Sequence, residues 1–453
     1  MSFVNSHRAS WRGSRCIAHL GLGLFALTVA ANAHAQAPAQ ASGAGVLLGT
    51  VLEAVQRQNP RLDAARAGAR AARARVPGVT RPPDPQLQLG WMNYELPSLR
   101  PMETIGMTQL QLMQMVPVAG KLRLAGLAET ARADASATRV ADVSFDLRAR
   151  AATVFYDLYA LDGTLRVSRG TRRLLQDIGD IAAKMYQVGD GRQADVLRAS
   201  VELARMQEDI IRMETMRTAL TARLNAMVAA PPDAALGEPQ LPLFPVALPA
   251  LDSLTRIAEL DRPMIRAGAQ DVDAADASAR LAQRDIWPDL QLGIQYGQQP
   301  GANGAQRMGS LMVGASLPVF ANSRQYALRE EANAMRAMAA ADLAAMRAET
   351  RGAVGEAQAS VVRSRRLAEL YRGSVLPQAE ATVSSSLSSY RVGTVNFMTL
   401  LDAQMTLNRY RQELFTLEAE EGKAWAELEM LTGRVLVDAN TAQPARPAGG
   451  PPK

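Results

Sequence analysis

The pattern Pro-x-Leu-x-Leu-Gly occurs twice in this 453-residue chain, as Pro85-Gln86-Leu87-Gln88-Leu89-Gly90 and as Pro288-Asp289-Leu290-Gln291-Leu292-Gly293. The two copies lie about 200 residues apart, and other motifs recur at nearly the same offset. The turn sequence Tyr186-Gln187-Val188-Gly189, for example, is matched by Tyr390-Arg391-Val392-Gly393. This period is far longer than that of solenoid repeats, so we interpret the chain as one duplicated unit.

Each copy has the same expected order of elements: a helical stretch, two short strands, a very long helix, a Tyr-x-x-Gly turn and a last helix. The long helices are expected over about 120–185 and 322–389, and at 1.5 Å per residue the first would be about 100 Å long. The predicted domains are a first repeat at 36–229 (strands about 86–96 and 107–116), a Pro-rich linker at 230–251, a second repeat at 252–436 (strands about 289–298 and 309–317), and a disordered tail at 437–453.

The last helix of each copy has a heptad pattern. In the second copy the a positions are Leu400, Leu407, Leu414, Glu421 and Leu428, and the equivalent residues of the first copy are Val196, Leu203, Ile210, Arg217 and Leu224. A sustained seven-residue period predicts helices coiled around a neighbour. Arg217 and Glu421 break the two seams at the same place, so they either pair between the repeats or are two solvated interruptions.

The short strands alternate between apolar and polar residues. Leu290, Leu292, Ile294 and Tyr296 share one face, whereas Gln291, Gly293, Gln295 and Gly297 share the other. Strands of about ten residues with this alternation are typical of a membrane barrel with a wet lumen, although two ordinary hairpins packed on helices are the alternative. Four strands are too few to close a barrel, and open edges are not tolerated in lipid, so several chains would have to pool their strands. A trimer would supply twelve.

The N-terminus has the pattern of a secretory signal peptide over residues 1–35. Arg8, Arg12 and Arg15 precede an apolar run over 17–31, and the small-residue triplet Ala33-His34-Ala35 follows. Removal of this segment would lower the net charge from +6 to about +3. Such a nearly balanced charge argues against nucleic acid as a partner.

Histidine and cysteine occur only in this N-terminal segment, as His7, His19, His34 and Cys16. The mature chain therefore has no Ser-His-Asp triad, thiol nucleophile or ordinary zinc site, and we predict no enzyme, no catalytic residue, no cofactor and no bound metal. Methionines such as Met107, Met113 and Met115 would be the remaining soft ligands, with packing as their alternative role.

Taken together, the duplication, the Pro-x-Leu-x-Leu-Gly strands and the Tyr-x-x-Gly turns resemble the TolC family of outer-membrane efflux ducts. The resemblance covers nearly all of 48–436. It implies a mainly α fold with a small β part: a homotrimer with a twelve-stranded outer-membrane β-barrel continued by a periplasmic coiled-coil barrel of helices. It also implies two partners, a periplasmic adaptor protein and an inner-membrane pump of the resistance-nodulation-division type.

The resemblance extends to the strand-to-helix junction. The segment 115–122, with Pro117, Gly120 and Lys121, is similar to the branch of the family that serves heavy-metal cation pumps. Pro318 is the counterpart of Pro117 in the second copy. Asn322, however, stands where Lys121 would recur.

Residue roles at the periplasmic tips are also carried over from the family. Tyr186, Gly189, Tyr390 and Gly393 would shape the tips that meet the adaptor. Asp195 and Asp402 would be the acidic candidates for an entrance constriction that attracts cations. Thr399 and Arg198 occupy the matching positions of the other copy and would weaken that ring. Alternatively, Asp195 caps its helix and Tyr390 is a core contact.

Two classes of function follow from these observations. The first is a passive outer-membrane exit duct for small solutes, either heavy-metal cations or drugs and other organic toxicants. The second is a periplasmic coiled-coil adaptor or structural rod.

Overall fold

The computed structural model describes residues 45–98, 100–102, 105–301 and 304–443. The predicted signal peptide lies outside these residues, as does the part of the predicted tail at 444–453. Residues 437–443, which we expected to be disordered, are described, and Val437 is buried. Its N–H donates to the Glu429 carboxylate at 2.9 Å, so the chain stays packed beyond the last helix.

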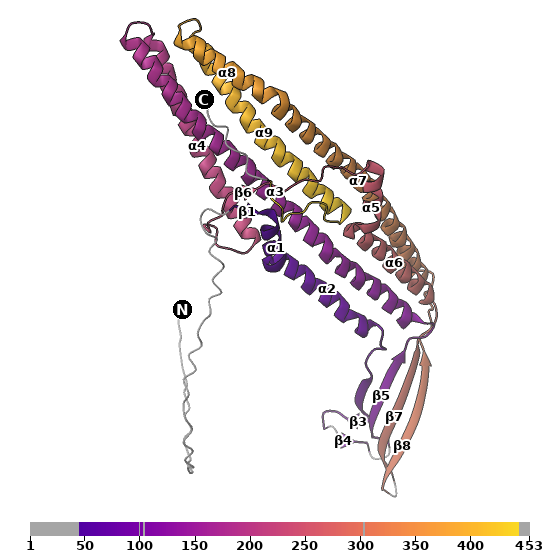
Figure 1. Ribbon diagram of the computed structural model, residues 1–453. Helices are drawn as coiled ribbons and strands as arrows, with labels where there is room; N and C mark the ends of the chain where they lie inside the picture. Colours follow the sequence, from indigo (N-terminus) through magenta and orange to yellow (C-terminus); the bar gives the residue numbers. More distant parts are fainter. Residues whose placement is uncertain (1–44, 99, 103–104, 302–303, 444–453) are drawn as a thin grey trace, which may run out of the picture. The chain divides into compact units, whose positions relative to one another are not determined.

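The first repeat forms two short helices, two main strands and a long helical hairpin (Figure 1). Short strand pairs flank these elements: β1 pairs with β6 in the linker, and β3 pairs with β4 between the main strands. The bounds are β1 Val46–Leu47, α1 Leu48–Gln58, α2 Pro60–Val79, β2 Gln86–Met92, β3 Tyr94–Glu95, β4 Arg100–Pro101, β5 Met107–Val116, α3 Lys121–Gln187, α4 Gln193–Met227 and β6 Pro239–Gln240.

The second repeat has the same order, apart from an interruption in its long helix. The bounds are α5 Leu251–Asp261, α6 Pro263–Arg284, β7 Leu290–Gly301, β8 Gly304–Ala315, α7 Gln325–Leu370, the π-helix η1 Tyr371–Val375, α8 Leu376–Arg391 and α9 Phe397–Thr432. The pattern predicted a strand over 86–96, but β2 ends at Met92, where Asn93 takes a left-handed φ of 57°. β7 and β8 reach further toward their connecting loop than the predicted 289–298 and 309–317.

Proline explains the interruption of the second long helix. α3 is a continuous helix of 67 residues. In the second repeat, Pro377 has no N–H to offer to the carbonyl four residues before it, so the helix is locally rewound. The N–H of Leu376 accordingly donates to the carbonyl of Tyr371, which is the i to i−5 bond of a π-helix.

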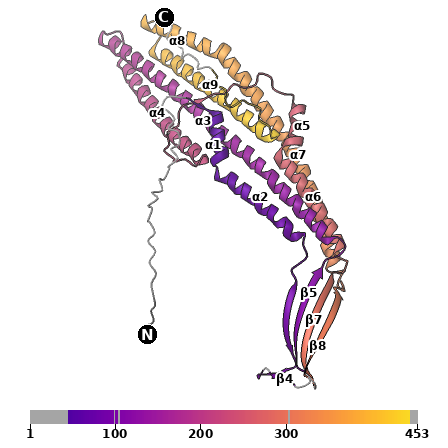
Figure 2. The same cartoon turned by 60° about the horizontal axis from the view of Figure 1, so that its bottom comes forward.

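The main strands form one antiparallel sheet in the order β2-β5-β7-β8. The first repeat therefore joins the second through β5 and β7, with Gln111 opposite Gln295. β2 and β8 lie at the two edges of this sheet, and each has a single neighbour there. Figure 2 shows β5, β7 and β8 running side by side, away from the helices.

The helices pack around α3, which contacts α2, α4, α6 and α9. Glycines allow α3 and α9 to interlock: Phe415 of α9 lies against Gly163 of α3, and Tyr156 of α3 lies against Gly422 of α9. A Cβ at either glycine would collide with the ring it faces. These contacts explain why Gly163 occurs in the middle of a helix that it does not end.

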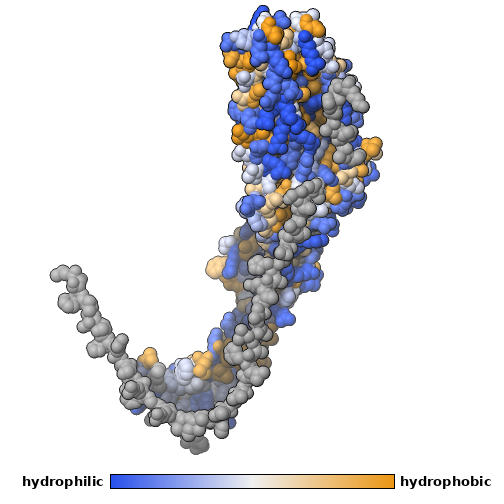
Figure 3. All heavy atoms as spheres, turned by 60° about the vertical axis from the view of Figure 1, so that its left-hand side comes forward, coloured by the Kyte–Doolittle hydropathy of each residue, from blue (hydrophilic) through white to orange (hydrophobic). Residues whose placement is uncertain are grey.

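The predicted heptad seams are confirmed. Leu400, Leu407, Leu414, Glu421 and Leu428 are all buried on α9, and none of the equivalent residues on α4 is exposed. On the face drawn in Figure 3, the hydrophilic surface of the helical part is broken by separate hydrophobic patches.

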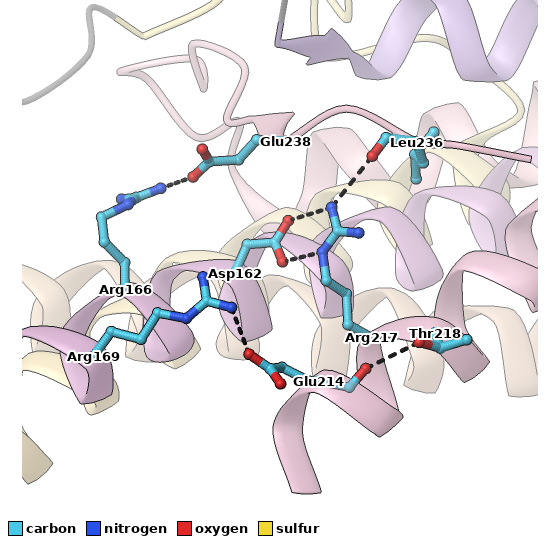
Figure 4. A network of polar contacts seen from close by, with 8 residues as sticks. All are labelled: Asp162, Arg166, Arg169, Glu214, Arg217, Thr218, Leu236 and Glu238. Atoms are coloured by element: carbon cyan, nitrogen blue, oxygen red, sulfur yellow. Dashed lines mark hydrogen bonds and ion pairs between the residues drawn. The ribbon is translucent and has the colours of Figure 1, made fainter. Parts of the chain in front are cut away.

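Arg217 and Glu421 do not pair with each other, and neither is a solvated interruption, because each forms an ion pair elsewhere, so both alternatives were wrong. Arg217 forms a two-pronged ion pair with Asp162 of α3, at 2.6 and 3.2 Å (Figure 4). Glu421 accepts from Arg365 of α7 at 2.8 Å. Each residue therefore pairs with the long helix of its own repeat, because that helix is its neighbour in the hairpin.

Candidate functional site

The first hairpin ends in a turn that requires glycine. Val188 is the C-cap of α3, and the following Gly189 has a φ of +86°. The Gly189 N–H donates to the Tyr186 carbonyl at 3.2 Å, and the Asp190 N–H donates to the Met185 carbonyl at 2.9 Å. This is the hydrogen-bond pattern of a Schellman motif, in which the left-handed residue is usually glycine.

The second hairpin ends in the same way. Gly393 has a φ of +76°, and its N–H donates to the Tyr390 carbonyl at 3.0 Å. The Thr394 N–H donates to the Ser389 carbonyl, also at 3.0 Å. The Tyr-x-x-Gly motif is therefore a helix C-cap in both repeats, and the tyrosine supplies one of the accepting carbonyls.

The two tyrosine side chains have different surroundings. Tyr186 is 48% exposed, whereas Tyr390 is 6% exposed and meets the Phe397 ring edge-on at 5.9 Å. Burial raises the pKa of Tyr390, and the negative charge of Asp195 raises it further. Tyr390 is thus a core contact, as one of our alternatives had it, and Asp195 of α4 approaches it from the other hairpin.

The four candidate constriction residues are arranged unequally. Asp402, Thr399 and Arg198 are exposed, and Asp195 is half-buried. Thr399 is bound to the cap of its helix: the Asn396 side chain accepts from the Thr399 N–H at 2.9 Å and from its hydroxyl at 3.0 Å.

Asp195 lies in the first turn of α4, which begins without a side-chain cap hydrogen bond in the described chain. Its negative charge there interacts favourably with the positive end of the helix dipole. The alternative that Asp195 caps the helix with its side chain was wrong.

The strand-to-helix junction has a buried ion pair between the repeats. The Lys121 ammonium donates to the Asp289 carboxylate at 2.9 Å and to the Trp287 carbonyl at 2.8 Å. It lies 3.9 Å from the Asp285 carboxylate. Burial raises the pKa of Asp285, Lys121 lowers it, and Asp289 raises it.

The other junction residues set up this contact. Pro117 directly follows β5, and Gly120, with a φ of +72°, precedes Lys121 at the start of α3. Pro318 lies in the longer connection between β8 and α7. Asn322, in the position equivalent to Lys121, is exposed there.

Sequence reasoning missed Asp289 as the partner of Lys121. A signal was present, because Asp289 replaces Gln86 in the second copy of the strand motif, and Lys121 replaces Asn322 in the first. Two unmatched charges of opposite sign, one in each copy, are what a contact between the repeats would produce.

The sheet has an unusual distribution of exposure. Along β7, exposed residues alternate with covered ones: Leu292, Ile294 and Tyr296 are exposed, whereas Gly293 and Gly297 are buried. Leu87, Leu89, Trp91, Leu311 and Val313 on the other strands are exposed as well. On β7 the apolar face is thus the more exposed one. We call the apolar face of the sheet its outer face and the polar face its inner face.

Within the described residues, no group of three or more His, Cys, Asp or Glu side chains is placed to hold a metal ion. Among the described helices, none is both long enough and apolar enough to cross a membrane.

A four-stranded sheet with an exposed apolar row, joined to long helical hairpins with glycine-capped tips, is the arrangement that the resemblance to outer-membrane efflux ducts implied. The chain belongs to the outer membrane efflux protein family, whose model matches residues 51–230 and 254–434. These two matches correspond to the two structural repeats. The protein is therefore an outer-membrane efflux protein, and its family is one of efflux proteins rather than enzymes.

Known proteins are similar to this chain in sequence or in fold. The cobalt-zinc-cadmium resistance protein CzcC of Cupriavidus metallidurans is 25% identical over 318 residues, which are 68% of this chain and 72% of that protein. The fold is similar to that of CusC, with a TM-score of 0.74 and 17% identity over 86% of this chain and 92% of CusC. The outer-membrane protein VceC of Vibrio cholerae gives a TM-score of 0.74 and 18% identity over 86% of this chain and 96% of VceC.

Proposed function

We propose that three copies of the chain close into a ring and form the passive exit duct of a tripartite efflux system. In this assembly β2 of one copy pairs with β8 of the next, which gives a twelve-stranded barrel in the outer membrane. The helical hairpins continue the barrel into the periplasm. The signal peptide at 1–35 would direct the chain to export.

The observation that carries this proposal is the exposed apolar face of the sheet. An exposed row of Leu, Ile and Trp side chains is unfavourable in water but suits contact with lipid. The unpaired edges at β2 and β8 also support the proposal. Unpaired backbone groups are not tolerated in a bilayer, so another strand must satisfy them. Each copy has both edges, so the pairing repeats until the ring closes.

The hairpin tips are proposed to meet the periplasmic adaptor. Tyr186, Gly189, Tyr390 and Gly393 shape these tips, with the exposed Tyr186 as the direct contact and the buried Tyr390 as its support. Asp402 is the stronger candidate for the entrance constriction, since it is exposed and a trimer places three copies around one axis. The inner-membrane partner is a pump of the resistance-nodulation-division type.

The proposed cargo is heavy-metal cations, and the similarity to the cobalt-zinc-cadmium resistance protein CzcC supports it. Drugs and other organic toxicants are the second class. The rival interpretation of a soluble periplasmic adaptor or rod has less support, since the outer face of its sheet would be left exposed to water.

Two neighbouring residues of β7 test the barrel. Ile294→Arg places a charge on the outer face, which destabilises a membrane strand by about 2–4 kcal/mol at the bilayer midplane. Gln295→Arg places the same charge on the inner face and is the matched control. We expect the first variant to lose the SDS-resistant trimer on unboiled gels, and the second to keep the trimer and shift single-channel selectivity toward anions.

Equal trimer yields from the two variants would contradict the assignment of the faces. A wild-type protein that stays monomeric and water-soluble without detergent would overturn the duct as a whole. Folded trimer that repeatedly gives no conductance in planar bilayers would favour the rod.

A further inference from the structure

The inner face of the sheet has a narrow composition. Along β2, β5, β7 and β8, the residues that alternate with the apolar outer row are all Gln, Gly, Ser or Met. Among these described strand residues the inner face has no charged side chain. It holds six methionines: Met92, Met107, Met113, Met115, Met308 and Met312.

Methionine is absent from the outer face of the same described strands, where the large apolar residues are Leu, Ile, Val, Trp and Tyr. A methionine used simply as apolar filling would suit the lipid side as well as any leucine. Its restriction to the polar side indicates that the thioether, rather than the apolar bulk, is the useful group.

The methionines meet over glycines of β7. Met312 is directly opposite Gly293 on β8, and Met113 is directly opposite it on β5. A Cβ placed on Gly293 would lie 3.2 Å from Met312 Cε and 3.6 Å from Met113 Cγ. The missing side chain thus leaves a space that both methionines enter from opposite sides.

A related but different arrangement lies four residues further along β7, where Gln109 rather than a methionine is directly opposite Gly297 on β5. Met308 is directly opposite Gly297, and the Met107 sulfur would lie 2.8 Å from a Cβ at that glycine. Between the two glycines lies Gln295, which is hydrogen-bonded to Gln109. At about 3.3 Å per residue, the two methionine pairs are about 13 Å apart along the strand.

We propose that these pairs, Met113 with Met312 and Met107 with Met308, are two stations for a soft monovalent cation, Cu⁺ or Ag⁺, in the wall of the duct. Thioether sulfur is a soft ligand that selects Cu⁺, whereas Zn²⁺ and Co²⁺ are normally held by imidazole, thiolate or carboxylate groups. Two thioethers above a glycine offer a shallow site, and conduction requires binding weak enough for the ion to leave. The proposal rests on the proposed duct, because it takes the inner face to be the lumen.

Silver binding by the purified trimer tests the proposal. The protein is the full mature chain in detergent, in nitrate buffer and without a histidine tag, so that neither tag imidazole nor chloride competes for Ag⁺. We expect saturable Ag⁺ binding in a calorimetric titration, with sulfur as the neighbour of silver in X-ray absorption, and no comparable binding of Zn²⁺ or Co²⁺. The variant with Met107, Met113, Met308 and Met312 all changed to Leu should bind Ag⁺ at least tenfold more weakly.

Leucine has nearly the volume of methionine, so the fold of this variant should be retained. The control changes two exposed methionines of α7, Met335→Leu and Met338→Leu, and should bind Ag⁺ like the wild type. Unchanged binding in the fourfold variant, or silver without sulfur neighbours in the wild type, overturns the proposal. The second measurement needs no variant.

Conductance separates this proposal from the duct on which it rests. A wild-type trimer that conducts in planar bilayers but does not bind Ag⁺ leaves the duct intact and removes the metal stations. A trimer that binds Ag⁺ through sulfur but does not conduct keeps the sites and removes the duct.

Discussion

At the position where α4 of the first repeat has Arg217, α9 of the second has Glu421, and the partners on the long helices are reversed as well. Asp162 lies opposite the arginine, and Arg365 lies opposite the glutamate. The ion pair therefore occupies the same position in both repeats, but the acidic and the basic residue have exchanged helices. In each repeat the pair joins the long helix to the last helix, and only the signs of the two charges differ.

The arginines of both pairs have a further role at the segment that joins the repeats. Arg217 donates to the Leu236 carbonyl at 3.3 Å, and Arg365 donates to the Pro245 and Val246 carbonyls, each at 2.8 Å. One arginine thus holds each end of this connecting segment. Since only arginine among these side chains can donate, the polarity of each pair also decides which helix holds the segment.

Other positions differ in burial rather than in sign. Lys121 is buried in an ion pair, while its counterpart Asn322 is exposed. Tyr390 is buried, while its counterpart Tyr186 is half exposed. The repeats therefore differ both at the strand-to-helix junction and at the hairpin tip, so substitutions at matching positions should have unequal effects.

The largest difference is expected at the strand-to-helix junction. Lys121→Met removes the partner of a largely covered Asp289 and should lower the free energy of unfolding by about 3 kcal/mol. Asn322→Met at the equivalent position should change it by less than about 0.5 kcal/mol. Denaturant titration of the trimer in detergent measures both, and equal effects would show that the junctions are equivalent after all.

An intermediate effect is expected at the polarity-reversed pair. Glu421→Arg places two arginines together and should destabilise the protein by about 2 kcal/mol. Adding Arg365→Glu restores the opposite charges but not the bonds to Pro245 and Val246, so we expect only partial rescue. Complete rescue in a double-mutant cycle would mean that the arginine does not hold the connecting segment.

The smallest effect is expected at Tyr390 at high pH. Its pKa is raised in the folded protein, so the unfolded tyrosine, with an ordinary pKa of 10.0, ionises first as the pH rises. Stability from this group is intact below pH 10 and falls above it, with at most one proton per chain linked to unfolding. Tyr390→Phe should flatten this dependence, and Asp195→Asn should reduce it. An unchanged slope in Tyr390→Phe would assign the effect to another group.

Much of the candidate site could be predicted from the sequence, because its signals are local. The Schellman turns follow from glycine three residues after tyrosine at a helix end, and the seam follows from its period. Tyr390 and Tyr186 occupy identical motifs, however, so the motif could not tell which ring is buried. That difference comes from Phe397 and from the neighbouring hairpin, which the local pattern does not contain.

By itself, the sequence determined the duplication, the alternation of the strands, the heptad seams and the family, because each depends on spacing along the chain. Only the tertiary structure decided which residues meet: Lys121 with Asp289, Arg217 with Asp162, and Met113 with Met312 over Gly293. These partners lie on different elements, and packing rather than periodicity brings them together. Side-chain type fixes what a residue is able to bind, and the fold fixes what lies within its reach.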